Sequence, residues 1–195
     1  MARNILIVES FFSGSHASWI KQYKRYSSHN IQVLSMKGQF WKWRMYGGAV
    51  TLAQEFMDLD FNPDIILATD MLDLTTFISL IRKRLKPSVP VAVYFHENQL
   101  TYTWKDDSRD KELKRDINYG FMNYTTALAS DHVFFNSHYN MNSFYKTLEK
   151  LLKKMPDYRH VGVINSLYNK SQVLPIGMNL RKIDADQTGE CVNNE

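Results

Sequence analysis

The chain has 195 residues, of which 44% are hydrophobic and 13% aromatic, and a formal net charge of +4. These values suit one folded domain with a substantial core and exclude an intrinsically disordered chain. The only cysteine, Cys191, excludes an internal disulfide, and no apolar run approaches the roughly 18 residues of a membrane-spanning helix. Without a signal-peptide segment before the first apolar run, we expect a cytoplasmic protein. Its mild positive charge permits a nucleotide or RNA partner without requiring one.

Short apolar runs alternate along the chain with longer segments of helical periodicity. A strand that is buried on both faces has no polar alternation, so these apolar runs are predicted to be strands. The predicted strands are 5–8, 31–34, 65–68, 91–95, 133–135 and one starting at 172, and the predicted helices are 17–26, 47–58, 74–85, 111–128, 141–152 and 161–168. This alternation predicts an α/β fold with a parallel sheet and right-handed crossovers.

The predicted helix 111–128 carries two stripes of different character. The apolar stripe is expected to pack on the sheet, and the small, polar stripe is expected to face a cleft or a neighbouring helix. The apolar stripe consists of Leu113, Ile117, Phe121, Tyr124 and Leu128, and the polar stripe of Asp116, Gly120, Asn123 and Ala127.

Four polar residues follow the predicted strand 91–95 directly, namely His96, Glu97, Asn98 and Gln99. In open α/β sheets, ligands bind in the crevice at the carboxyl ends of the strands. We therefore interpret this run as a candidate site, with His96 and Glu97 able to perform acid–base chemistry. The alternative is that the four residues form only a solvated loop.

The first predicted strand also ends in a segment suited to ligand binding, from Glu9 to His16. Gly14 and Ser15 lie just before a predicted helix, which Ser13 or Ser15 is placed to cap. Unpaired N–H groups at a helix start can bind an anion or a sugar. The glycine pattern does not match the dinucleotide fingerprint or the phosphate-binding P-loop. The alternative for His16 is a helix-start residue that hydrogen-bonds only to backbone.

Residues 37–46 combine aromatic rings with cations and are predicted to form a loop that ends at two glycines, after which a helix begins. A tryptophan such as Trp43 can stack on a sugar or a base, and an arginine such as Arg44 can bind a phosphate. The alternative is a hydrophobic plug with Trp41 and Trp43 in the core.

The fifth predicted strand ends at Asn136 and Ser137, which are also placed to cap the following helix. Because the carboxyl ends of parallel strands meet at one edge of a sheet, we predict that residues from several strand exits converge on one concave edge. The residues predicted to converge are His16, Trp43, His96, Glu97 and Asn136.

Several runs of the chain resemble the amino-terminal domain of the tRNA-queuosine α-mannosyltransferase family and its bacterial relatives. These runs are Glu9 and Phe11 with 14–16, Trp41 with 43–44, 95–100, 135–137 with 140–141 and 143–144, and 115–116 with 119–120. The run 95–100, which reads Phe-His-Glu-Asn-Gln-Leu, is the most distinctive. Residues 173–179 resemble the segment that joins the two halves of many GT-B glycosyltransferases. Ser13 departs from the pattern, since relatives often have a second glycine there.

The resemblance implies a retaining glycosyltransferase that transfers mannose from the nucleotide sugar GDP-mannose to queuosine in tRNA, with no cofactor and no metal. It implies that residues 1–179 are the Rossmann-like, acceptor-side domain of a GT-B fold and that residues 180–195 are a severed interdomain linker. The carboxyl-terminal GT-B domain, which grips the diphosphate, would be a missing partner, so this isolated chain is expected to be inactive. The competing interpretation is a stand-alone Rossmann-like module that binds a nucleotide or RNA without catalysis.

The resemblance also implies roles at the matched positions. His96 would touch the donor sugar, and Glu97 would orient the acceptor or stabilise positive charge at the sugar carbon, which makes these two residues the expected catalytic pair. The segment 14–16 would face the donor phosphates and the acceptor, and 43–44 would receive the acceptor base or its backbone. The expected substrate-binding residues are Gly14, Ser15, His16, Trp43, Arg44, Asn98, Gln99, Asp116, Asn136 and Ser137.

Overall fold

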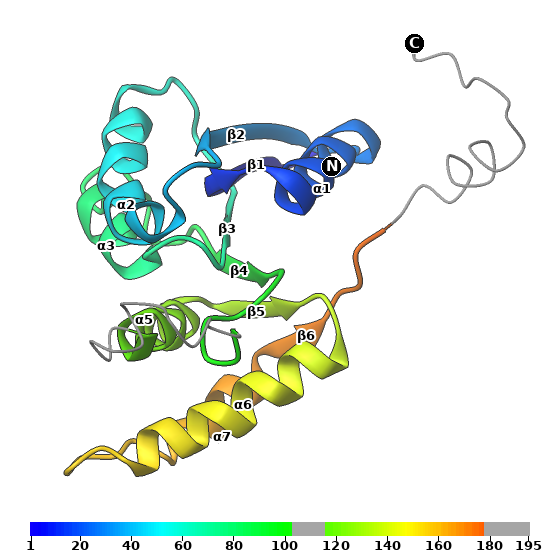
Figure 1. The fold of residues 1–195 in the computed structure, drawn as a ribbon. Helices are drawn as coiled ribbons and strands as arrows, with labels where there is room; N and C mark the ends of the chain where they lie inside the picture. The colour runs from blue at the N-terminus through cyan, green and yellow to red at the C-terminus, as the bar shows by residue number, and fades with distance from the viewer. Residues whose placement is uncertain (103–115, 178–195) are drawn as a thin grey trace, which may run out of the picture.

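The computed structural model describes residues 1–102 and 116–177, which form one six-stranded sheet with helices on both faces (Figure 1). The strand order is β2-β1-β3-β4-β5-β6, and every neighbouring pair is parallel. The strands are β1 (Asn4–Phe12), β2 (Asn30–Lys37), β3 (Ile65–Thr69), β4 (Val91–Phe95), β5 (His132–Phe135) and β6 (Ser171–Val173). The predicted α/β, Rossmann-like parallel sheet is therefore confirmed.

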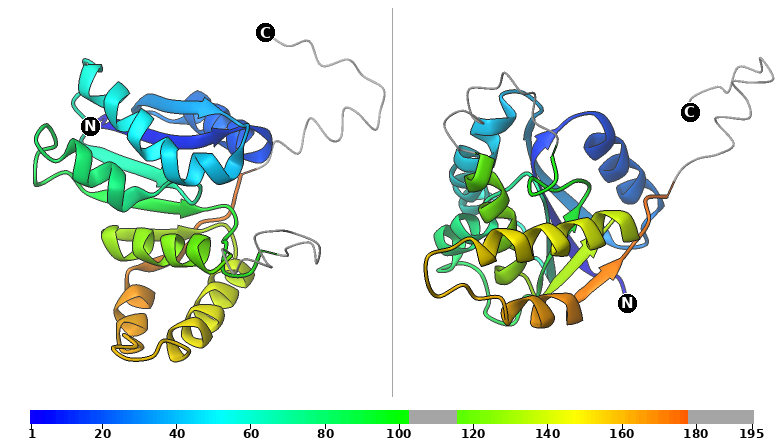
Figure 2. Two further views of the ribbon diagram at one scale, coloured as in Figure 1. Left: turned by 60° about the vertical axis from the view of Figure 1, so that its left-hand side comes forward. Right: turned by 60° about the horizontal axis from the view of Figure 1, so that its bottom comes forward.

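The described helices divide unequally between the two faces of the sheet (Figures 1 and 2). They are α1 (Gly14–Tyr26), α2 (Trp41–Asp58), α3 (Leu74–Ile81), α5 (Asp116–Ala129), α6 (His138–Lys153) and α7 (Val163–Asn169). Helix α1 packs through Ile20 on Ile5 and Ile7 of β1. The other helices share one large apolar core on the opposite face, which includes Phe95 and Phe135. Since β4 has helices behind it and α1 side chains in front, all five of its residues are buried.

The strand order creates a topological switch point between β1 and β3. The chain leaves β1 through α1 toward β2, whereas it leaves β3 through α3 toward β4 on the other side. Connections that diverge in this way open a crevice at the carboxyl ends of the two strands. The polar segments after β1, β3, β4 and β5 all lie at this edge.

Helix α2 begins at Trp41, so the prediction of a loop through residue 46 was wrong. Gly47 and Gly48 are buried in the helix interior and do not end a loop. A Cβ atom added at Gly48 would lie 2.7 Å from the Cβ atom of Ser10 on β1, closer than such atoms approach. Gly48 therefore allows the helix to pack closely against the strand, whereas Gly47 leaves room for the Trp43 side chain of the same helix. Phe40, with φ of 52°, holds the left-handed conformation just before the helix.

The burial of α5 also differs from the prediction. Ile117, Phe121 and Leu128 were expected in the core, yet each is about two-fifths exposed. Tyr124 of the apolar stripe is buried as predicted, but Gly120, Asn123 and Ala127 of the polar stripe are buried as well, Asn123 with no exposed surface. Asn123 bonds to backbone groups at two strand exits, so its amide is satisfied and its burial is tolerated. A predicted helix at 111–115, with Leu113, lies outside the described residues.

Two contacts fasten the last described segment to the sheet. The hydroxyl of Tyr94 donates a hydrogen bond to the carbonyl oxygen of Leu174 at 2.7 Å, and the Leu174 N–H donates to the Phe135 carbonyl at 2.8 Å. Lys170 donates from Nζ to the carbonyls of Leu128, in the last turn of α5, and of Ser130, just beyond this helix. The predicted linker, 180–195, lies outside the described residues. Among the helices that the structure describes, none has the length and apolar character required to cross a membrane.

Candidate functional site

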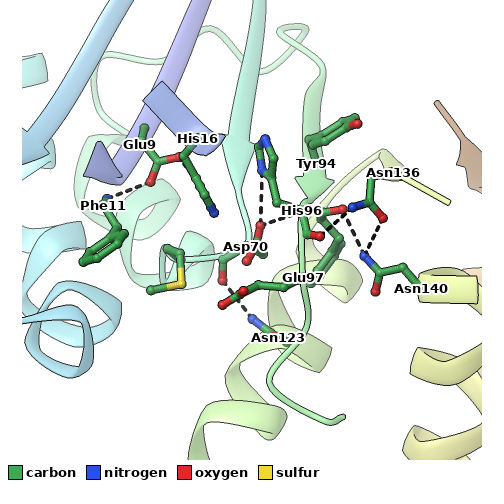
Figure 3. Close-up of polar contacts among 12 residues, drawn as sticks. Glu9, Phe11, His16, Asp70, Tyr94, His96, Glu97, Asn123, Asn136 and Asn140 are labelled. Atoms are coloured by element: carbon green, nitrogen blue, oxygen red, sulfur yellow. Dashed lines mark hydrogen bonds and ion pairs between the residues drawn. The ribbon is translucent and has the colours of Figure 1, made fainter. Parts of the chain in front are cut away.

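Two histidines from distant parts of the sequence stack face to face at the carboxyl edge of the sheet (Figure 3). His16 comes from the first turn of α1, and His96 follows β4. Their ring centroids are 4.1 Å apart, with an interplanar angle of 27°. The predicted meeting of these two strand exits is thus confirmed.

A buried carboxylate holds His16 in place. Glu9, at the exit side of β1, has no exposed surface, and its Oε2 atom lies 2.7 Å from His16 Nδ1. Its Oε1 atom accepts the Phe11 N–H at 2.7 Å, which fixes the carboxylate against the turn. His16 is thus bonded to a side chain, and the alternative in which backbone alone satisfied it was wrong.

The electrostatic surroundings keep His16 protonated. Burial alone would lower the pKa of His16, but the hydrogen bond that His16 donates to Glu9 and the negative charges of Asp70, Glu9 and Glu97 outweigh it and raise the pKa to about 9. At neutral pH the ring is therefore an imidazolium that donates to Glu9 through Nδ1. The site thus contains a fixed positive charge stacked on His96.

A second buried carboxylate, Asp70, follows β3 and lies against His96. Its Oδ1 atom accepts the His96 backbone N–H at 2.9 Å and lies 3.5 Å from His96 Nδ1. Among the described residues, Asp70 Oδ2 and both ring nitrogens of His96 are buried without a hydrogen-bond partner. Buried polar atoms of native proteins are seldom left unpaired, so a water molecule or a ligand group is the expected partner of these three atoms.

His16, Asp70 and His96 are residue types that bind metals, and their candidate donor atoms all lie within 4.8 Å of one another. Separations of this size overlap those of ligands around one ion, so distance alone does not exclude a metal. Glu9 already occupies His16 Nδ1, however, and a protonated His16 has no free lone pair to offer. The excess negative charge here is balanced by a proton on His16, and the absence of a metal stays a prediction.

An amide network shapes the loop after β4. Asn136 donates from Nδ2 to the His96 carbonyl at 2.7 Å, and Asn140 donates to the Phe95 carbonyl at 3.1 Å. Asn98 donates to Asn140 Oδ1 at 2.7 Å, and the Ser137 hydroxyl caps α6. These residues therefore fix the backbone on which His96 and Glu97 are presented.

Two adjacent cavities open at this edge, and Glu97 lines both. The first has a volume of about 280 Å³ and is lined by Phe11, Ser13, Gly14, Ser15, His16, Trp41, Met71, Glu97, Gln99 and Tyr102. The second has a volume of about 500 Å³ and is lined by His96, Glu97, Asn98, Thr101, Tyr102, Asn136, Ser137, Tyr139, Asn140 and Ser143. Most of the sequence-predicted site residues therefore come together around one crevice.

Glu97 differs from the two buried carboxylates in being exposed to the cavities. Its Oε1 atom accepts a hydrogen bond from Gln99 Nε2 at 3.2 Å. Burial and the negative charge of Asp70 raise the pKa of Glu97, while the positive charge of His16 and the bond from Gln99 partly oppose this. Glu97 is thus the carboxylate placed to meet a ligand.

Trp43 and Arg44 line neither cavity. Trp43 is 63% exposed on α2, and Arg44 donates from Nε to the Lys37 carbonyl at 3.1 Å. Trp41 lines the first cavity instead and packs beside Met45 and Met71. The predicted packing of a tryptophan into the hydrophobic interior therefore holds for Trp41 and not for Trp43. A substrate contact by Trp43 or Arg44 stays a prediction. The side chain of Asp116 lies outside the described part of the chain.

Sequence reasoning missed three functional candidates: Glu9, Asp70 and Asn123. Glu9 breaks an apolar strand, and Asp70 follows β3 as His96 follows β4, so each carried a positional signal. Asn123 belonged to the polar stripe of α5. What no pattern showed was that Glu9 reaches His16 and that Asp70 reaches His96.

Comparison with known proteins shows which family the sequence resembles. Residues 4–178 match the family model described as tRNA-queuosine alpha-mannosyltransferase N-terminal. A protein of Drosophila melanogaster, named tRNA-queuosine alpha-mannosyltransferase, is 31% identical over 196 residues. The match covers 98% of the present chain and 48% of that relative, so the chain spans about half the relative's length.

Proposed function

Because this chain belongs to the tRNA-queuosine α-mannosyltransferase N-terminal family, we propose that the whole protein transfers mannose to queuosine in tRNA. GDP-mannose is the proposed donor and residues 1–179 form the acceptor-side domain. A second GT-B domain would bind the diphosphate of the donor. A tRNA acceptor also motivates placing the reaction in the cytoplasm. The observation that best supports a catalytic site is the His16–His96 stack, which two buried carboxylates hold.

The start of α1 is the proposed face for the donor phosphates. Gly14 and Ser15 line the first cavity at the first turn of this helix, where free N–H groups and the helix dipole favour an anion. The His16 imidazolium lies close by and adds positive charge, which its partner Glu9 offsets in part. Preorganised positive charge of this kind stabilises a departing diphosphate, because no reorganisation is needed when the bond breaks.

The loop after β4 is the proposed face for the sugar. His96 has ring nitrogens without a partner among the described residues, so it can hydrogen-bond to a sugar hydroxyl. Asp70 brings negative charge to the same place, which favours the positive charge that develops at the sugar carbon during transfer, while Glu97 is placed to orient the acceptor. The amide network keeps these groups fixed before the substrate arrives.

A transfer assay with the full-length protein tests this proposal. Radiolabelled mannose from GDP-mannose should enter tRNA that contains queuosine and should not enter tRNA that lacks it. His96→Ala should lower kcat/KM by about 100-fold or more, as expected when a donor that acts on the transition state is lost.

The matched control is His132→Ala, since His132 is exposed at the opposite end of the sheet and should leave transfer unchanged. The thermal midpoints of both variants should stay close to that of the native protein. Binding of queuosine tRNA without any mannose transfer would instead support the binding-module interpretation. Equal transfer by His96→Ala and the native protein would contradict the site assignment.

A further inference from the structure

The wall of the first cavity formed by Glu97 and Gln99 presents hydrogen-bond acceptors. Gln99 uses Nε2 to donate to Glu97, while its Oε1 atom is buried without a partner among the described residues. A carboxylate has about four acceptor positions, of which Gln99 occupies one. A ligand on this wall must therefore supply donors, which means hydroxyl or N–H groups and not phosphate oxygens.

Aromatic rings adjoin this acceptor wall. Trp41 and Tyr102 line the same cavity, with ring centroids 6.0 Å apart. The face of an aromatic ring attracts cations, and Lys42, which does not line the cavity, already lies with Nζ 5.8 Å from the centroid of Trp41. The surroundings therefore suit a flat or cationic group more than an anionic one.

The charges around the cavity also favour a cation at this wall. The described residues that line it include no lysine or arginine. Glu9 is neutralised by its contact with the His16 imidazolium, which leaves the charges of Asp70 and Glu97 without a bonded cation. The positive end of the cavity is at the start of α1, and the negative end is at Glu97.

We infer that Glu97 and Gln99 bind a protonated amine on the acceptor, together with hydroxyl groups beside it. The inference rests on the proposed function, and it makes Glu97 the residue that selects the acceptor. The donor phosphates take the α1 end of the same crevice, so the opposite charges at the two ends orient the two substrates. A charge-assisted hydrogen bond to such an amine is stronger than a neutral one.

Two stem-loop RNAs that differ in one position test this inference in the full-length protein. Both carry an acceptor nucleoside with the same hydroxyl groups, joined through a secondary amine in one and through an ether oxygen in the other. The native protein should show a KM and a Kd about tenfold lower for the amine RNA, a difference of about 1.4 kcal/mol.

The isosteric variant Glu97→Gln should lose this preference. Its KM for the amine RNA should rise about tenfold to the value of the ether RNA. Its kcat should stay within about threefold, because the lost contact stabilises the bound substrate and the transition state equally. Glu97→Asp should keep part of the preference. The control Glu55→Gln changes an exposed carboxylate on α2, and it should behave as the native protein does.

Equal affinity of the native protein for the two RNAs would overturn the inference, as would a Glu97→Gln variant that loses kcat equally with both. These results are distinguishable from failure of the proposed function, in which no mannose enters queuosine tRNA at all. In that event the two Kd values still decide whether Glu97 recognises the amine.

Discussion

At the scale of single residues, the site depends on where charge is buried. Glu9 and Asp70 have no exposed surface, and isolated carboxylates in such positions would be strongly destabilised. Glu9 is stabilised by the His16 imidazolium, and Asp70 accepts a backbone N–H. Each of the two stacked histidines therefore has a buried carboxylate beside it, and contacts within the fold hold that carboxylate in place.

The Glu9–His16 pair predicts a specific pH dependence of stability. The folded-state pKa of His16, about 9, is above its ordinary value of 6.5, so its contribution is complete below pH 6.5 and is lost as the pH rises through 9. The loss should be about 3 kcal/mol in the free energy of unfolding, as an order of magnitude.

Urea unfolding of the native protein at pH 6, 7.5 and 9 would measure this loss. Glu9→Gln should be less stable at pH 6 and should flatten the curve between pH 6.5 and 9, since His16 then loses its main partner. A Glu9→Gln protein whose curve stayed parallel to that of the native protein would assign the pH dependence to other groups.

At the scale of elements, close approach of backbones decides where α2 and α5 lie. Gly48 brings α2 onto β1 beside Ser10, and Gly120 brings α5 onto the loop after β4, where an added Cβ would lie 2.8 Å from Leu100. These contacts position Trp41, which lines the first cavity, and Asn123, which accepts the Gln99 N–H. Helix position and site geometry are therefore coupled.

Gly48→Ala tests this coupling. Replacing glycine inside a helix usually stabilises by about 0.5–1 kcal/mol, but here the added methyl group meets Ser10 and should destabilise by about 1–3 kcal/mol. The matched control is Gly162→Ala, because no atom lies within 4 Å of its added Cβ. Denaturant titration should separate the two variants in sign. A stabilised Gly48→Ala protein would mean that α2 and β1 can move apart at little cost.

At the scale of the whole molecule, the chain spans about half the length of the relative that it matches. The sheet and helices of the described residues enclose a core of their own, and 26 of these described residues form the main buried cluster. The crevice lies at one edge, and its polar side chains are held by contacts within the described residues (Figure 3). The proposed donor grip belongs to a second domain.

Residues 1–195 alone should therefore fold and yet fail to transfer mannose. Interfaces between domains are usually more polar than cores, so loss of the partner should leave the fold intact. Transfer needs the diphosphate held while the acceptor is aligned, and this chain is expected to meet only the second need. Circular dichroism, calorimetry with GDP-mannose and a radiolabelled transfer assay would check this. Tight binding of GDP-mannose with measurable turnover would contradict the domain assignment.

The sequence by itself determined the fold class and the edge of the sheet that carries the site. Apolar runs without alternation, such as 91–95, predict strands covered on both faces, because burial of every side chain is a local property of the run. The polar segments that follow such runs, with His16 after the first strand and His96 after the fourth, then had to lie at one edge once the strands were parallel.

Only the tertiary structure decided which of those side chains touch and which helix face is buried. The contacts from Glu9 to His16 and from Asp70 to His96 depend on strand order and side-chain direction, which no local pattern encodes. On α5, hydrophobicity predicted the wrong face for Phe121, because the hydrogen bonds of Asn123 made the polar face the better one to bury. Burial of a polar group depends on its partners, and those partners are brought to it from distant segments by the fold.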